Sequence, residues 1–125
     1  MGKKVLFVDD DEHWRLVVQT SLTEAGYHVV TVSDTGDAIL RLSQTGPDLI
    51  ILDLDLGGES GLELMNYAKQ HLPAVPVLLY TGMERDNPFV QRMLQQGADQ
   101  YLRKGRPEAL LEAVKAAVKA QPARE

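Results

Sequence analysis

The feature that most constrains the fold is a fivefold alternation of short apolar runs with segments of helical periodicity. The apolar runs predict five strands, at residues 5–8, 29–32, 49–52, 75–80 and 99–102. Apolar residues recur at helical spacing after each run, and Gly26, Gly46-Pro47 and Gly97 are typical helix stop signals. This alternation predicts an α/β fold with a parallel sheet and right-handed crossovers. The carboxyl ends of all the strands should therefore lie along one edge.

The third apolar run, Leu49-Ile50-Ile51-Leu52, is followed directly by Asp53. A strand without polar alternation is typical of a parallel sheet that helices cover on both faces. Ligands of such sheets bind outside the carboxyl ends of the strands. Asp53 is therefore a candidate for chemistry, and the other strand ends should supply its partners.

Composition narrows the class of protein. The 125 residues are 44% hydrophobic and 25% charged, which is typical of one globular domain. We expect residues 1–120 to form this domain and residues 121–125 to be a tail or the start of a linker. The net charge of −5, without a Lys/Arg cluster, argues against a nucleic-acid surface. There is no cysteine, and no apolar stretch is long enough for a signal peptide or a membrane span, so we expect a cytoplasmic protein.

Polar side chains follow four of the predicted strands: Asp9 and Asp10 the first, Asp53 the third, Thr81 the fourth and Lys104 the fifth. Three neighbouring carboxylates repel one another unless a cation is present, and Mg²⁺ suits a set of carboxylate and phosphate oxygens. A hydroxyl and a lysine are suitable donors to a phosphoryl group on a carboxylate. The pattern therefore predicts an acyl-phosphate site with Mg²⁺ as cofactor. Taken alone, an Asp-Asp pair after a strand also fits a helix cap.

Four ordered motifs resemble those of the receiver domain of two-component response regulators. They are Phe7-Val8-Asp9-Asp10-Asp11-Glu12, Asp48 to Leu54, Leu78-Leu79-Tyr80-Thr81-Gly82, and Gly97-Ala98-Asp99-Gln100-Tyr101-Leu102-Arg103-Lys104. The resemblance covers about residues 3 to 119. It implies a flavodoxin-like, doubly wound (βα)5 fold, whose five-stranded parallel sheet has the order 2-1-3-4-5 and helices on both faces. It also implies a phosphorylation-dependent signalling switch, which is no enzyme beyond self-phosphotransfer and autodephosphorylation.

The resemblance assigns a phosphoryl acceptor and a metal site. Asp53 would accept the phosphoryl group and also bind the metal. Asp10 would be the principal metal carboxylate, with Asp9 supporting it, through water. The backbone carbonyl of Asp55 would complete the Mg²⁺ site.

The resemblance also implies how the switch works and with whom. Thr81 would hydrogen-bond the phosphoryl group, Lys104 would pair with it, and Tyr101 would be the aromatic switch residue. A strand aromatic such as Tyr101 also fits a packing role. The phosphoryl donor would be a sensor histidine kinase or a histidine phosphotransfer protein. The changed surface, on the fourth helix, fifth strand and fifth helix, would control an effector or an attached output domain, and phosphorylation could produce a homodimer.

The sequence departs from the family pattern at several positions. Gly57 stands where the family usually has proline, which predicts a looser loop. Gly105 replaces the proline that usually follows the lysine with a cis bond, so we expect a trans Lys104-Gly105 bond. The segment from Thr81 to Gly97 is about one residue longer than usual. Asp55 and Met83 flank the route of an attacking water, and we hypothesise that they tune the lifetime of the phosphorylated state.

Parts of the sequence also fit two other functions. Asp53-Leu54-Asp55 matches the Asp-x-Asp motif of haloacid-dehalogenase-type phosphatases, but the order of the motifs is reversed here and the chain has no cap segment. A receiver-shaped interaction module that works without phosphate is the second alternative, which the departure at Gly105 leaves open.

Two apolar residues of the first helix differ in their predicted surroundings. Trp14 is expected to pack in the core at the start of the helix. Leu16 falls off the apolar stripe and is expected to be exposed, either to dock a partner or as an ordinary surface leucine.

Overall fold

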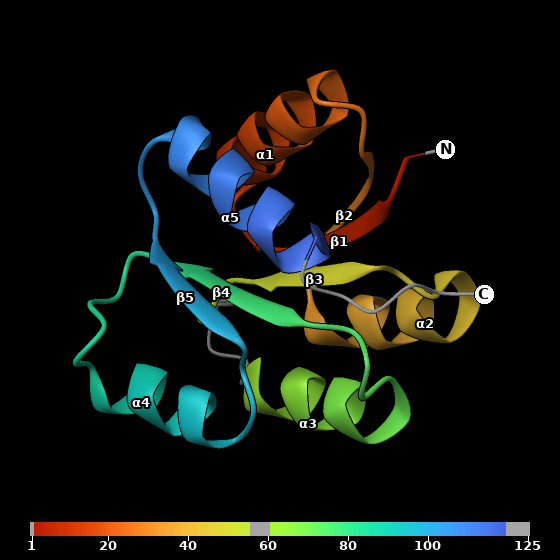
Figure 1. The fold of residues 1–125 in the computed structure, drawn as a ribbon. Helices are drawn as coiled ribbons and strands as arrows, with labels where there is room; N and C mark the ends of the chain where they lie inside the picture. Colours follow the sequence, from red (N-terminus) through yellow and green to blue (C-terminus); the bar gives the residue numbers. More distant parts are fainter. Residues whose placement is uncertain (1, 56–60, 120–125) are drawn as a thin grey trace.

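A five-stranded parallel sheet lies between two layers of helices (Figure 1) in the computed structural model, which describes residues 2–55 and 61–119. The strands are β1 (Lys4–Val8), β2 (His28–Val32), β3 (Leu49–Leu52), β4 (Val77–Thr81) and β5 (Gln100–Arg103). The helices are α1 (Glu12–Glu24), α2 (Thr35–Thr45), α3 (Gly61–His71), α4 (Pro88–Gln95) and α5 (Pro107–Lys119). The strand order is β2-β1-β3-β4-β5, which confirms the predicted flavodoxin-like fold.

Local chemistry explains where the elements begin and end. The Asp11 side chain caps α1 by accepting the His13 N–H. Pro88 occupies the first turn of α4, where its missing N–H costs no hydrogen bond. Strand β4 starts two residues later than predicted because the Val75 N–H bonds to Leu72 in the preceding turn. Pro76 has no N–H to donate, although its carbonyl accepts from β3.

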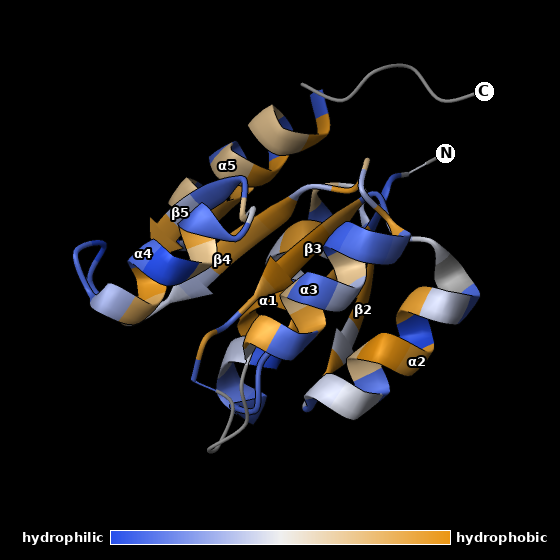
Figure 2. Cartoon of the chain, turned by 90° about the horizontal axis from the view of Figure 1, so that it is seen from below, coloured by the Kyte–Doolittle hydropathy of each residue, from blue (hydrophilic) through white to orange (hydrophobic). Residues whose placement is uncertain are grey.

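Neighbouring side chains of β3 enter opposite apolar layers, which explains its unbroken apolar run. Ile50 packs in the cluster that α2, α3 and α4 cover. Ile51 packs in the cluster that α1 and α5 cover. Both side chains are fully buried. Figure 2 shows the same arrangement, with hydrophobic central strands and helices of mixed polarity around them.

None of the described helices combines the length and the apolar character needed to cross a bilayer.

Two leucines of α1 provide a matched test of the core. The Leu22 side chain is fully buried, whereas Leu16 is 63% exposed, as predicted. Leu22→Ala should lower the free energy of unfolding by about 2–5 kcal/mol because it leaves a cavity between α1 and the sheet. Leu16→Ala should change the free energy by less than about 0.5 kcal/mol. Urea denaturation followed by circular dichroism measures both, and equal losses would contradict this packing.

Candidate functional site

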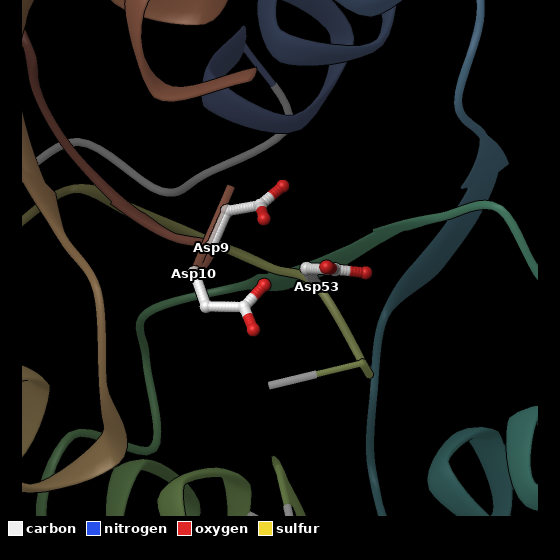
Figure 3. Close-up of side chains that lie close together, drawn as sticks. All are labelled: Asp9, Asp10 and Asp53. Carbon is white, nitrogen blue, oxygen red and sulfur yellow. The ribbon is translucent and has the colours of Figure 1, made fainter. Parts of the chain in front are cut away.

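Three carboxylates meet at the carboxyl edge of the sheet. Asp9 and Asp10 follow β1, and Asp53 follows β3 (Figure 3). One carboxylate oxygen from each lies within 4.8 Å of the others. The Asp9 and Asp53 side chains are buried, whereas Asp10 is exposed to solvent. The predicted acidic group therefore has two buried members and one that faces solvent.

Backbone hydrogen bonds hold the two buried acids in place. The Asp9 N–H donates to the Val32 carbonyl of β2 over 3.1 Å, and the Asp53 N–H donates to the Val8 carbonyl of β1 over 2.9 Å. The Asp9 carboxylate also accepts the Asp11 N–H at 2.9 Å. Both acids thus continue the ladder of the sheet and have little freedom to move apart.

Lys104 lies between the buried acids. Its Nζ is 2.6 Å from Asp9 Oδ2 and 3.2 Å from Asp53 Oδ2. Its backbone N–H donates to the Thr81 carbonyl over 2.8 Å, which fixes the start of the β5–α5 loop. Burial lowers the pKa of the Lys104 ammonium. The hydrogen bond to Asp9 and the charges of Asp53 and Asp9 outweigh burial, so the pKa lies above its ordinary value.

The surroundings of Asp53 favour its protonated form. Burial and the charge of Asp9 raise the pKa of Asp53 from 3.8 to about 6, although Lys104 opposes the shift. The backbone N–H of Asp55 also favours the charged form. However, no described group makes a hydrogen bond of standard geometry to the buried Asp53 Oδ1. A buried carboxylate oxygen without such a partner fits a site for a cation.

The donor set suits a hard divalent cation such as Mg²⁺. All the ligand atoms are carboxylate oxygens, and exposed Asp10 leaves room for the waters that Mg²⁺ retains. The Asp55 side chain is exposed and does not belong to this group in the described structure. Binding of a metal by the Asp55 carbonyl stays a prediction.

Thr81 and Tyr101 are linked through the backbone of Met83. The Met83 N–H donates to Thr81 Oγ1 over 3.3 Å. The Tyr101 hydroxyl donates to the Met83 carbonyl over 2.5 Å. Thr81 is buried and Tyr101 is partly buried against the α2–α4 side of the core. This link was not predicted, because it uses main-chain atoms that no residue type reveals.

Two glycines that depart from the family pattern have different outcomes. No peptide bond among the described residues is cis, so the predicted trans Lys104-Gly105 bond is confirmed. Gly57 lies outside the described residues, as does the predicted tail at 121–125.

Two aromatic rings pack beside Lys104, and the sequence did not reveal this contact. Trp14 is partly buried, as part of the α1–α5 side of the core. Its ring lies 5.1 Å from Lys104 Nζ and edge-on to the Tyr80 ring, with centroids 5.7 Å apart. Helical spacing predicted only that Trp14 packs in the core, because spacing does not identify its neighbours on other elements.

Comparison with known proteins identifies this arrangement. The sequence pattern of the response regulator receiver domain matches residues 5–115. The chain belongs to this family. Receiver domains are the phosphorylation-dependent switches of two-component systems. Acids and a lysine at the carboxyl edge of the sheet are the arrangement expected of this family.

Named relatives and solved structures agree with this assignment. PhoP of Bacillus subtilis, an alkaline phosphatase synthesis transcriptional regulatory protein, is 36% identical over 83% of this chain and 43% of its own. PhoB of Escherichia coli, a phosphate regulon transcriptional regulatory protein, is 31% identical over 95% of this chain and 53% of its own. The CheY-like receiver domain of Methanospirillum hungatei has a TM-score of 0.88 and 26% identity, with 95% of each chain covered. The chain spans about half the length of the curated relatives it matches.

The raised pKa of Asp53 predicts a pH-dependent stability difference. A folded-state pKa of about 6 means that Asp53 binds more protons in the folded receiver than in the unfolded chain between pH 4 and 6. The contribution of Asp53 to stability therefore falls as pH rises through this range. Without divalent ions, the free energy of unfolding of Asp53→Asn, taken relative to that of the native chain, should rise by about 1–3 kcal/mol from pH 4 to pH 7.

Urea unfolding at several pH values, in the presence of a chelator, measures this difference. Asp55→Asn is the matched control because it removes a neighbouring, exposed carboxylate. Because that side chain is exposed, this variant should not reproduce the growing advantage of Asp53→Asn. A constant difference between Asp53→Asn and the native chain would contradict the raised pKa.

Proposed function

We propose that this receiver domain accepts a phosphoryl group on Asp53 from a histidine kinase or a histidine phosphotransfer protein. The observation that carries the proposal is the position of Lys104, whose ammonium contacts Asp9 and Asp53 together. A carboxylate oxygen of Asp53 attacks the phosphorus, so an O–P bond forms and the P–N bond of phosphohistidine breaks. The electron pair of that bond stays on the imidazole nitrogen, which then takes a proton.

The charges around Asp53 fit this step. Only the ionised carboxylate is a nucleophile, and a pKa of about 6 leaves Asp53 mostly ionised at neutral pH. Lys104 is 12% exposed and positively charged, so it stabilises negative charge that develops on the phosphoryl oxygens. A partly buried lysine already in contact with the acceptor needs little rearrangement for this role.

Asp10, Asp53 and the Asp55 carbonyl would hold Mg²⁺, with Asp9 supporting through water. The ion, when bound, neutralises the charge of the acids and of the incoming phosphoryl oxygens. Asp53 Oδ1, which lacks a hydrogen bond of standard geometry, is the acceptor oxygen with most to gain from it.

The link through Met83 supports a conformational readout. The Thr81 hydroxyl would turn toward the phosphoryl group and give up the Met83 N–H. The Tyr101 hydroxyl bonds to the same residue, so the two side chains would respond together. Phosphorylation would thereby shift the population of two states of the α4, β5 and α5 surface.

The partners follow from this reaction. The donor is a phosphohistidine protein of the cytoplasm, and the recipient of the signal is an effector protein or an attached output domain. The second possibility is supported by relatives that are named transcriptional regulators and are about twice as long. Nucleic acid would then be bound by the output domain and not by this one.

Incubation with acetyl phosphate and Mg²⁺ tests the proposal. Intact-mass spectrometry should show the gain of one phosphoryl group by the native chain. Asp53→Asn should show no gain, because the amide is not a nucleophile. Lys104→Ala should be phosphorylated more slowly, by about 10- to 100-fold, through loss of charge stabilisation.

Other outcomes of the same experiment favour other functions. No phosphoryl gain from acetyl phosphate or from a phosphohistidine donor would favour an interaction module that works without phosphate. Continuous turnover of p-nitrophenyl phosphate would favour a phosphatase that uses Asp53-Leu54-Asp55. A sizing column run before and after phosphorylation tests whether the proposed homodimer forms.

The lifetime of the phosphorylated state should depend on Asp55 and Met83. Asp55→Asn should slow dephosphorylation because it removes a carboxylate that can orient the attacking water. Met83→Ala should accelerate dephosphorylation because it shortens a side chain beside the route of that water. Each change should be about tenfold, or about 1.4 kcal/mol in the barrier.

Loss of the phosphoryl mass over time, after removal of acetyl phosphate, measures both rates. Glu63→Gln on α3 is the charge-matched control for Asp55→Asn and should leave the rate unchanged. Native rates in both variants would contradict the tuning role.

A further inference from the structure

The glycine that follows Lys104 has a backbone donor that the usual proline would lack. The Gly105 N–H donates to the Tyr80 hydroxyl over 3.3 Å. The same hydroxyl lies 3.5 Å from the Gly105 carbonyl oxygen, to which it donates. Both polar groups of Gly105 are therefore held by one side chain, directly after the lysine.

Tyr80 is well placed to hold this segment rigidly. It is 1% exposed and belongs to β4, next to Thr81. Burial raises the pKa of Tyr80, so its hydroxyl keeps its proton at all ordinary pH values and can both donate and accept. A buried side chain on a central strand has few alternative rotamers, so the Gly105 backbone is fixed to the sheet.

The other side of the lysine is occupied by a ring. Trp14 meets Tyr80 edge to face, at an interplanar angle of 88°. Lys104 Nζ is 5.1 Å from the centre of the Trp14 ring, within the range of a cation–π contact. The ammonium thus has the two carboxylates as partners and an aromatic ring beside it.

We propose that Tyr80 is a positioning residue for Lys104: it clamps the Gly105 backbone in the trans form, and Trp14 supports the ammonium against Asp9 and Asp53. This rests on the proposed function, because Lys104 is the group that would stabilise the phosphoryl transfer. The clamp does for this chain what a rigid residue after the lysine would do. Without it, Gly105 leaves the loop free and the four-carbon stem of Lys104 samples other positions.

The rate of phosphorylation by acetyl phosphate with Mg²⁺ tests the clamp. Tyr80→Phe keeps the ring and removes only the hydroxyl. It should slow phosphorylation by roughly threefold to tenfold, because both long hydrogen bonds between the hydroxyl and the Gly105 backbone are lost. Tyr27→Phe removes a hydroxyl on the same side of the core, at the far end of α1, and should leave the rate unchanged.

A double-mutant cycle with Lys104→Ala separates positioning from a general structural effect. If Tyr80 acts through Lys104, Tyr80→Phe causes no further loss of rate in the Lys104→Ala background. An equal loss of rate on Tyr80→Phe in the native and Lys104→Ala backgrounds would overturn the proposal, and so would no loss in either. Phosphorylation of the native chain in the same assay shows that the proposed function itself stands.

The fluorescence of Trp14 gives a readout that needs no phosphate, since it is the only tryptophan in the chain. Lys104→Ala should shift its emission by removing a charge beside the ring. In the Tyr80→Phe background this shift should be smaller, because the lysine lies beside the ring for less of the time. An equal shift in both backgrounds would overturn the clamp. A native chain that takes up no phosphoryl group would overturn the proposed function instead, and the emission data would still decide the position of Lys104.

Discussion

The ion group of Asp9, Asp53 and Lys104 is the interaction on which the site depends. Two buried carboxylates side by side are costly, since each loses hydration and repels the other. The lysine lies within 2.6 and 3.2 Å of them and leaves the group with one uncompensated negative charge. That remainder is consistent with the raised pKa of Asp53 and with a place for a cation. The group is therefore compatible with the folded sheet, and it retains a negative charge that a cation can neutralise.

The sheet supplies the rigidity that this ion group needs. Asp9, Asp53 and Lys104 each come directly after the last residue of a strand, and each N–H makes one more bond to the neighbouring strand. The site residues are thus the final rungs of the ladder, fixed by the main chain of β1, β3 and β5. Apolar residues on both faces bury β1 and β3, which is what removes water from Asp9 and Asp53. The packing of the core therefore also determines the electrostatics of the site.

Much of this could be predicted from sequence because periodicity and strand ends are local signals. The apolar run before Asp53 shows a strand buried on both faces, and Ile50 and Ile51 do enter opposite layers. Contacts between distant segments were not predictable in the same way. Nothing in a sequence shows that Met83 joins Thr81 to Tyr101 through its backbone, or that Trp14 lies beside Lys104. The start of β4 was placed two residues early because Val75 is apolar, although its N–H is used by a turn.

Gly105 stands where the family usually has proline, and hydrogen bonds to Tyr80 hold the backbone there instead. A trans glycine brings flexibility, and it also brings an N–H group that proline lacks. The Tyr80 hydroxyl bonds to that group, and burial of the Tyr80 side chain holds the hydroxyl in place beside the loop. The edge-on contact with Trp14 then fills the space between α1 and the sheet and brings a ring face toward the ammonium. Glycine, tyrosine and tryptophan at these positions form one unit, so the departure at Gly105 is explained by residues far from it in sequence. The segment after Lys104 is thus held in place by Tyr80, although a glycine alone would leave it flexible.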